Sequence, residues 1–67
     1  MIQITVNGKD VELDQAMSIN AYLDHIGLRG RRVAVAVNSE VLHEDEYEKT
    51  VISDGDTVEV VRPIGGG

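Results

Sequence analysis

Cysteine, tryptophan and phenylalanine are all missing from this sequence of 67 residues, and its single proline is Pro63. Without a thiol, the chain can form no disulfide framework, no cysteine-based zinc site and no thiol nucleophile. Packing alone must hold a fold that lies near the lower size limit for a single hydrophobic core. We therefore expect one domain and look for chemistry that needs no cysteine.

Long apolar segments are also missing. No stretch approaches the roughly 20 apolar residues that a membrane-spanning helix needs, and the segment Met1–Asn7 contains no basic leader. The lack of thiols suits a reducing compartment. These absences predict a soluble, cytoplasmic protein with no membrane partner.

Positive charge is scarce. Six lysine and arginine residues stand against twelve acidic residues, which gives a formal net charge of −6. Such an excess repels the phosphates of nucleic acids, so we expect no nucleic-acid partner. Arg29, Arg31 and Arg32 form the only basic cluster, and it lacks the interleaved aromatic residues on which bases stack. We interpret it as a polar connection between a helix and a strand rather than a docking patch.

The first segment has the pattern of a β-hairpin. Apolar and polar side chains alternate over residues 2–6, and the alternation resumes at Val11 and Leu13. Asn7 and Gly8, which lie between the two runs, tolerate the positive φ angles of a tight turn. The pattern predicts two half-buried antiparallel strands.

A short helix is predicted next. The hydroxyl of Ser18 can cap its first turn, and Gly27 can supply the left-handed residue that ends it, with Leu28 folding back. A helix of about eight or nine residues does not persist alone, so it must pack on the sheet. The apolar stripe expected to do so consists of Ile19, Tyr22, Leu23 and Ile26.

The run 33–37 is apolar and rich in valine, as expected of a central strand. Its valines are predicted to face the helix, whereas Ala34 and Ala36 would leave the opposite face flat. A turn at residues 38–39 precedes a short strand at 41–42.

The remaining segments complete the predicted order of elements. Residues 43–49 are interpreted as a polar loop or a single helical turn, and residues 53–56 as a turn. Residues 57–61 then form the last strand. This order predicts an α+β fold of the ubiquitin-like β-grasp type, in which a mixed sheet of four or five strands packs on one helix. We expect the domain to span residues 1–62, followed by a flexible C-terminal tail at 63–67.

No residue pattern indicates a catalytic site, so the chain is interpreted as not being an enzyme. His25 and His43 lie in no motif that pairs them with a nucleophile, and His25 suits the C-terminal end of a helix. Residues 43–46 collect possible metal ligands, but adjacent loop residues cannot all point at one ion, and no metal-binding spacing occurs. The serines are in cap and turn contexts: Ser18, Ser39 and Ser53.

An exposed apolar patch is predicted beside the end of the last strand. Val61 should point outward there and join Ala34 and Ala36. Exposed apolar patches commonly mark partner sites, and Arg62 lies next to this one. We interpret these residues as a partner interface that continues into Pro63 and Ile64.

The tail itself is the remaining candidate for chemistry. Pro63 has no N–H to donate, so it ends central strand pairing. Residues 63–67 can reach roughly 17 Å from the sheet at about 3.3–3.6 Å per residue. Without side chains, Gly65, Gly66 and Gly67 can enter a narrow channel and present a carboxylate there. The alternative is a frayed end with no function.

With this tail on such a domain, the whole chain resembles the ThiS/MoaD-type family of ubiquitin-like sulfur-carrier proteins. The resemblance rests on residues 33–38, on residues 54–61 and on the terminal pair Gly66-Gly67. Within the family it is nearest to the ThiS branch, which carries sulfur for the thiazole ring of thiamine.

The resemblance implies a reaction cycle carried out by partners. The carboxylate of Gly67 would be adenylated by a ThiF-like enzyme that uses ATP, converted to a thiocarboxylate with sulfur from a donor, and delivered to thiazole synthase. The carrier itself would hold no cofactor stably and would be a monomer when free.

Two departures from the family pattern keep other branches open. Leu42-His43 stands where ThiS-like sequences often have Pro-Arg, and Arg62-Pro63-Ile64 is similar to the approach to the tail in MoaD-like carriers. The alternatives are therefore a sulfur carrier for molybdopterin or cysteine synthesis, and a ubiquitin-like modifier joined through Gly67 to target lysines. A plain binding module, with an incidental tail, is a third.

Overall fold

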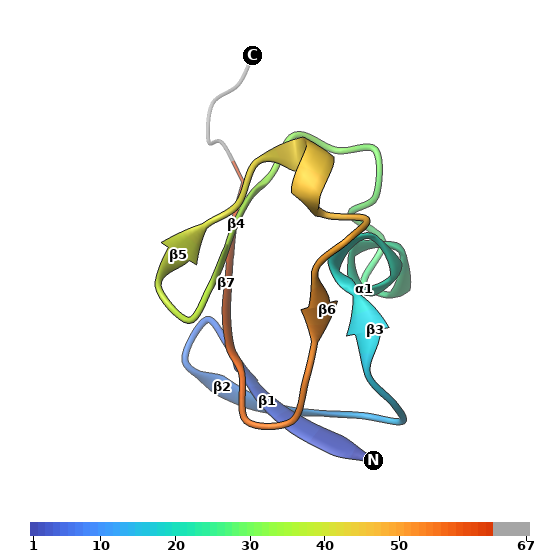
Figure 1. Ribbon diagram of the computed structural model, residues 1–67, viewed down its shortest axis with the longest axis vertical. Helices are drawn as coiled ribbons and strands as arrows, with labels where there is room; N and C mark the ends of the chain where they lie inside the picture. The colour runs from blue at the N-terminus through green and yellow to red at the C-terminus, as the bar shows by residue number, and fades with distance from the viewer. Residues whose placement is uncertain (63–67) are drawn as a thin grey trace.

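A mixed sheet of five strands dominates the computed structural model, which describes residues 1–62 (Figure 1). The strand order is β2-β1-β7-β4-β5; β1 and β7 run parallel, and the other neighbours are antiparallel. The strands are β1 (Ile2–Val6), β2 (Lys9–Leu13), β4 (Ala34–Val37), β5 (Glu40–Val41) and β7 (Thr57–Val61).

The predicted hairpin is confirmed. Asn7 and Gly8 both adopt positive φ angles, of 50° and 82°, which lets two residues join β1 to β2. The register places Ile4 opposite Val11. The apolar side chains of the two strands therefore lie on the same face, toward the core.

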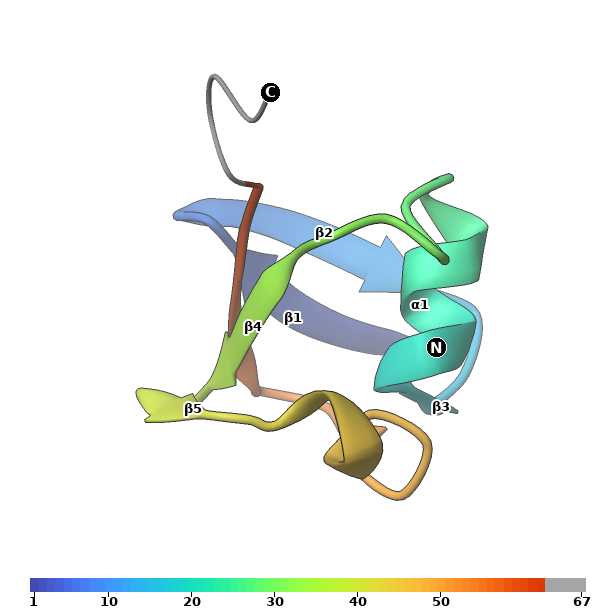
Figure 2. The same cartoon turned by 90° about the horizontal axis from the view of Figure 1, so that it is seen from above.

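Helix α1 (Ile19–His25) covers one face of the sheet (Figure 2). Ser18 caps it as predicted, because its Oγ accepts a hydrogen bond from the N–H of Ala21 at 3.1 Å. The helix is only seven residues long, so its stability depends on the side chains that it buries against the sheet.

The helix ends where the sequence predicts. Gly27 has a φ of 77°, and the N–H of Leu28 donates to the carbonyl of Leu23 at 2.7 Å. Together with the bond from Gly27 N–H to Asp24 at 3.1 Å, this is the hydrogen-bond pattern of a Schellman cap. The prediction that Ile26 is buried is wrong: its side chain is 39% exposed, because it lies at the C-cap, where the chain turns away from the core.

A second pair of strands was not predicted. β3 (Met17–Ser18) and β6 (Val51–Ile52) form a two-stranded antiparallel sheet. The N–H of Ile19 continues this pairing with a 2.9 Å bond to the carbonyl of Thr50. This small sheet ties the start of the helix to the segment that precedes β7.

The segment 43–49 is more ordered than a polar loop. It contains a single 3-10 turn, η1 (Glu44–Glu46), and Tyr47 directly after it is only 5% exposed. The Tyr47 hydroxyl donates to the carbonyl of Val33 at 3.3 Å. Tyr47 therefore belongs to the core rather than to the surface. The short strand before η1 lies one residue earlier than expected, at β5.

The core lies between the sheet and the helix, and the opposite face of the sheet stays uncovered (Figure 2). This arrangement confirms the predicted α+β architecture of the β-grasp type. Within residues 1–62, no helix combines the length and apolarity needed to cross a membrane. The buried side chains are those of Ile4, Leu13, Ile19, Tyr22, Leu23, Val35, Tyr47, Ile52 and Val58.

Candidate functional site

The predicted apolar patch lies on the uncovered face of the sheet. Ala34 is paired directly with Val61 across the β4–β7 ladder, and Ala36 is paired with Glu59. Val41 of β5, which pairs with Ala36, extends the patch. Val61 is 60% exposed and Val41 is 73% exposed. We call Ala34, Ala36, Val41 and Val61 the apolar face.

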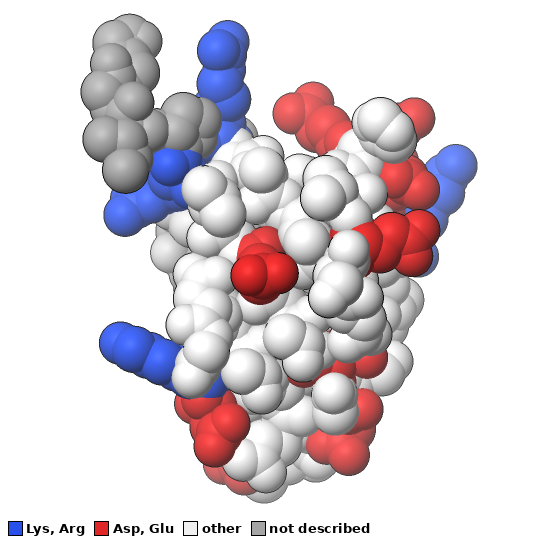
Figure 3. Space-filling view, turned by 90° about the vertical axis from the view of Figure 1, so that its left-hand side faces the viewer, with Lys and Arg blue, Asp and Glu red and all other residues white. Residues whose placement is uncertain are grey.

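Figure 3 shows this side of the molecule as a broad area with few charged side chains, while most charges gather at its margins. Glu59 is exposed within the apolar face, so the surface is apolar without being wholly uncharged. A surface of this kind suits contact with another protein.

Arg62 directly follows β7 and is exposed. It extends the apolar face toward the C-terminal residues. The other predicted tail and interface residues lie outside the described part of the chain: Pro63, Ile64, Gly65, Gly66 and Gly67.

The end of β7 is held by a side chain that the sequence indicated only as a turn residue. β1 pairs with β7 as far as Val6 and Val58, and the chain then turns away at Asn7. Beyond that point, the Asn7 side chain makes the hydrogen bonds to β7 that the backbone of β1 no longer makes. Its Oδ1 accepts from the N–H of Val60 at 2.9 Å, and its Nδ2 donates to the Val60 carbonyl at 3.1 Å.

The start of β7 is held in a similar way by Asn38. Its Oδ1 accepts from the N–H of Thr57 at 2.9 Å, and its Nδ2 donates to Oδ1 of Asp56 at 3.1 Å. The other carboxylate oxygen of Asp56 accepts from the N–H of Ser53 at 2.8 Å. Side-chain hydrogen bonds thus hold β7 near both of its ends.

Of the side chains considered for catalysis, that of Ser18 has a structural role, and those of His25 and His43 are exposed. Ser18 caps α1, His25 is exposed in its last turn, and the N–H of His43 donates to Oε2 of Glu46 at 2.7 Å. Burial raises the pKa of the Tyr22 hydroxyl. No cluster of three or more histidine and acidic side chains suited to a metal ion occurs within residues 1–62.

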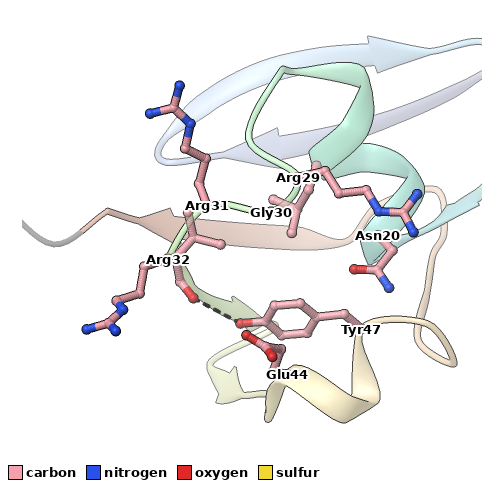
Figure 4. Close-up of a pocket in the computed structure, with 9 residues that line it drawn as sticks. Asn20, Arg29, Gly30, Arg31, Arg32, Glu44 and Tyr47 are labelled. Carbon is pink, nitrogen blue, oxygen red and sulfur yellow. Dashed lines mark hydrogen bonds between the residues drawn. The ribbon is translucent and has the colours of Figure 1, made fainter.

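A surface hollow lies between α1, the connection 29–32 and η1 (Figure 4). Three arginines line it, but they diverge: Arg29 points toward Asn20, whereas Arg31 and Arg32 point away from the hollow. Because the guanidinium groups do not converge, the hollow is not a site for a small anion.

Comparison with known proteins identifies one family. The model of the ThiS family matches residues 3–67. The sulfur carrier protein ThiS of Bacillus subtilis is 31% identical over 65 residues, which cover 96% of this chain and 98% of that protein. A crystal structure of the thiamine biosynthesis protein ThiS from Geobacter metallireducens superposes with a TM-score of 0.85 at 32% identity. That alignment covers 98% of this chain and 100% of the other.

A longer relative is also similar. A protein named thiazole synthase, from Paramagnetospirillum magneticum, is 33% identical over 66 residues. The match covers 98% of this chain but only 20% of that protein. In this relative, a segment similar to the whole chain is therefore part of a much larger polypeptide.

Proposed function

The chain belongs to the ThiS family, and from this premise we propose that it is a sulfur carrier for thiamine biosynthesis. The observation that carries the proposal is the family match, which extends over residues 3–67 and so includes the terminal glycines. The relatives named as sulfur carriers support the same function. The thiazole synthase relative favours the thiamine branch over molybdopterin or cysteine synthesis.

The proposed reactive group is the carboxylate of Gly67. A carboxylate is a poor electrophile, so a ThiF-like enzyme would first use ATP to convert it to an acyl adenylate, releasing pyrophosphate. Hydrosulfide released by the sulfur donor would then attack the acyl carbon, and as the C–S bond forms the bond to AMP breaks, leaving a thiocarboxylate and free AMP. This sulfur, held on the carrier, is the group delivered to thiazole synthase. ATP and the sulfur donor are bound by the partner enzymes, and the carrier itself is a substrate.

In this proposal the domain, residues 1–62, serves as a handle and residues 63–67 serve as the arm. Hydrogen bonds from Asn7 and Asn38 hold β7 near both of its ends, so the strand that precedes the arm is fixed to the domain. Pro63 cannot donate a strand hydrogen bond. Five extended residues reach roughly 17 Å at about 3.3–3.6 Å each, which is long enough to enter a buried active site.

The partner interface proposed here is the apolar face together with Arg62. Val61 of this face belongs to β7, the strand that precedes the arm in sequence, so an enzyme that binds the face is well placed to receive the tail. Burial of apolar side chains contributes about 25 cal/mol for each Å² removed from water. Both the ThiF-like enzyme and thiazole synthase are expected to use this surface, one after the other.

The direct test is mass spectrometry of the intact chain. The chain is incubated with the ThiF-like enzyme, ATP and a sulfur donor, and the exchange of one oxygen for sulfur at Gly67 is the expected product. A variant without Gly66 and Gly67 is the control; it should fold normally and gain no sulfur. Failure of the full chain to gain sulfur from a donor and enzyme that thiolate another carrier would reject the proposal.

A further inference from the structure

Most of the positive charge of this acidic chain is concentrated at one end of the molecule. Four of the six basic residues lie in the connection 29–32 and at Arg62. The sheet brings these segments together, because β4 and β7 are antiparallel and Ala34 pairs with Val61. Arg32, shortly before β4 begins, and Arg62, directly after β7 ends, therefore lie at the same end of this strand pair.

The arginine side chains at this end of the β4–β7 strand pair point in two directions. In Figure 4, Arg31 and Arg32 extend outward on the side where β7 ends, whereas Arg29 points to the opposite side, toward Asn20. All of these arginines are exposed. Figure 3 shows basic side chains gathered at the end of the molecule from which the described chain leaves β7. We call Arg31, Arg32 and Arg62 the basic collar.

We infer that the basic collar docks on an acidic protein surface at the entrance to the active site that receives the tail. The inference rests on the proposed function and identifies the chemistry of the partner: carboxylates around the channel mouth of the ATP-dependent activating enzyme. In this inference the apolar face supplies contact area, and the collar orients the carrier so that its C-terminal end faces the active site of the enzyme.

Charge favours a protein partner over a nucleic acid. The chain carries a net charge of −6, so a long anionic polymer would be repelled by the rest of the molecule. The two tyrosines, Tyr22 and Tyr47, are 4% and 5% exposed, so neither phenol ring is available for base stacking. A local acidic rim can meet the collar without approaching the acidic surfaces elsewhere.

Because its arginines are exposed, the collar should act mainly on the rate at which carrier and enzyme associate. Exposed charges on a rim steer the encounter and select its orientation, and their effect is screened by salt over about 10 Å at 0.1 M ionic strength. A positive end on a negative molecule gives the carrier a strong charge asymmetry, with its positive side where β7 ends. The activating enzyme would therefore meet the tail end first.

The test compares two double variants with the same change in net charge. Arg31→Glu with Arg32→Glu reverses the collar, whereas Lys9→Glu with Lys49→Glu alters exposed lysines on the hairpin and after η1. Adenylation of the carrier by the ThiF-like enzyme is measured by ATP–pyrophosphate exchange at several carrier and NaCl concentrations. We expect the collar variant to raise KM by about 10-fold or more at low salt with kcat nearly unchanged. Its KM should also depend less on salt than that of the wild type.

The lysine control should remain within about twofold of the wild-type KM, since neither lysine belongs to the collar. Equal KM values for the two double variants, or a wild-type salt dependence in the collar variant, would overturn the inference. Thermal melting checks that both variants fold, and Arg31→Gln with Arg32→Gln repeats the test with a smaller change of charge.

A second measurement separates this inference from the proposed function. Direct binding of the ThiF-like enzyme to the immobilised carrier needs no chemistry. If wild-type carrier binds but is not adenylated, the proposed function fails while the collar is still tested by the loss of binding in the collar variant. If adenylation proceeds and the collar variant behaves as wild type, only the collar is rejected. If the wild-type carrier does not bind, both are rejected.

Discussion

The two faces of the β4–β7 strand pair are built from alternate residues of the same short segments, yet their most buried and most exposed valines differ sharply in exposure. On the inner face, Val35 and Val58 are 1% and 0% exposed and pack against the helix side of the core. On the outer face, Val61 is 60% exposed. The difference shows how one strand pair can serve two needs in a chain of this size: the inner face holds the fold, and the outer face stays exposed, as the proposed partner interface requires.

The largest effect should come from a charge on the inner face. Val35→Asp would bury an unpaired carboxylate, at a cost of several kcal/mol against a total stability of about 5–15 kcal/mol. We expect the variant to be unfolded at room temperature by circular dichroism. Ala34→Asp, one residue away on the outer face, is the matched control and should melt cooperatively near the wild-type temperature. A native melt for Val35→Asp would show that the inner face is assigned wrongly.

The alternation that separates these faces was predictable from the sequence. Large and small residues alternate over 33–37, and the turn and caps around the helix follow local rules for Asn7-Gly8, Ser18 and Gly27. These features depend on neighbours within a few residues. The pattern therefore predicted the exposed positions of Ala34 and Val61 correctly, whereas Ala36 on the same face is half-buried.

Other features depend on contacts between distant residues, and the sequence did not reveal them. β3 and β6 are each two residues long, too short to show a period. Tyr47 lies between glutamates in sequence, yet the fold carries it into the core. The position of the 29–32 connection beside the end of β7 follows from the strand order, which local patterns do not specify.

An intermediate loss of stability is expected when Asn7, which supports the end of β7, is replaced. Asn7→Gly keeps the positive φ angle that the turn requires but removes both hydrogen bonds to Val60. We expect a loss of about 1 kcal/mol, which lowers the melting temperature by roughly 4–8 °C in a domain of this size. Hydrogen exchange at the Val60 amide should accelerate more than exchange at Val35. Unchanged protection of Val60 would show that the side chain does not hold the strand.

The smallest effect on stability, and the sharpest contrast with Val35→Asp, is expected for Val61→Asp. The same carboxylate on the outer face stays in water, so we expect the free energy of unfolding to change by no more than about 0.5 kcal/mol. Binding to the ThiF-like enzyme should nevertheless fall by roughly 10-fold or more, because a charge would replace an apolar contact in the interface. Chemical denaturation and a binding titration on the same preparation test both parts.

Val51→Asp is the matched control for Val61→Asp, since it makes the same substitution and the same change in net charge at an exposed position of β6, outside the apolar face. It should bind the enzyme with nearly wild-type affinity. Equal weakening by both variants would mean that net charge, rather than the apolar face, governs binding. If a stable Val61→Asp variant bound the enzyme with wild-type affinity, the interface could not include the apolar face at Val61. Selective weakening by Val61→Asp alone would separate the two faces by function as clearly as their exposure does.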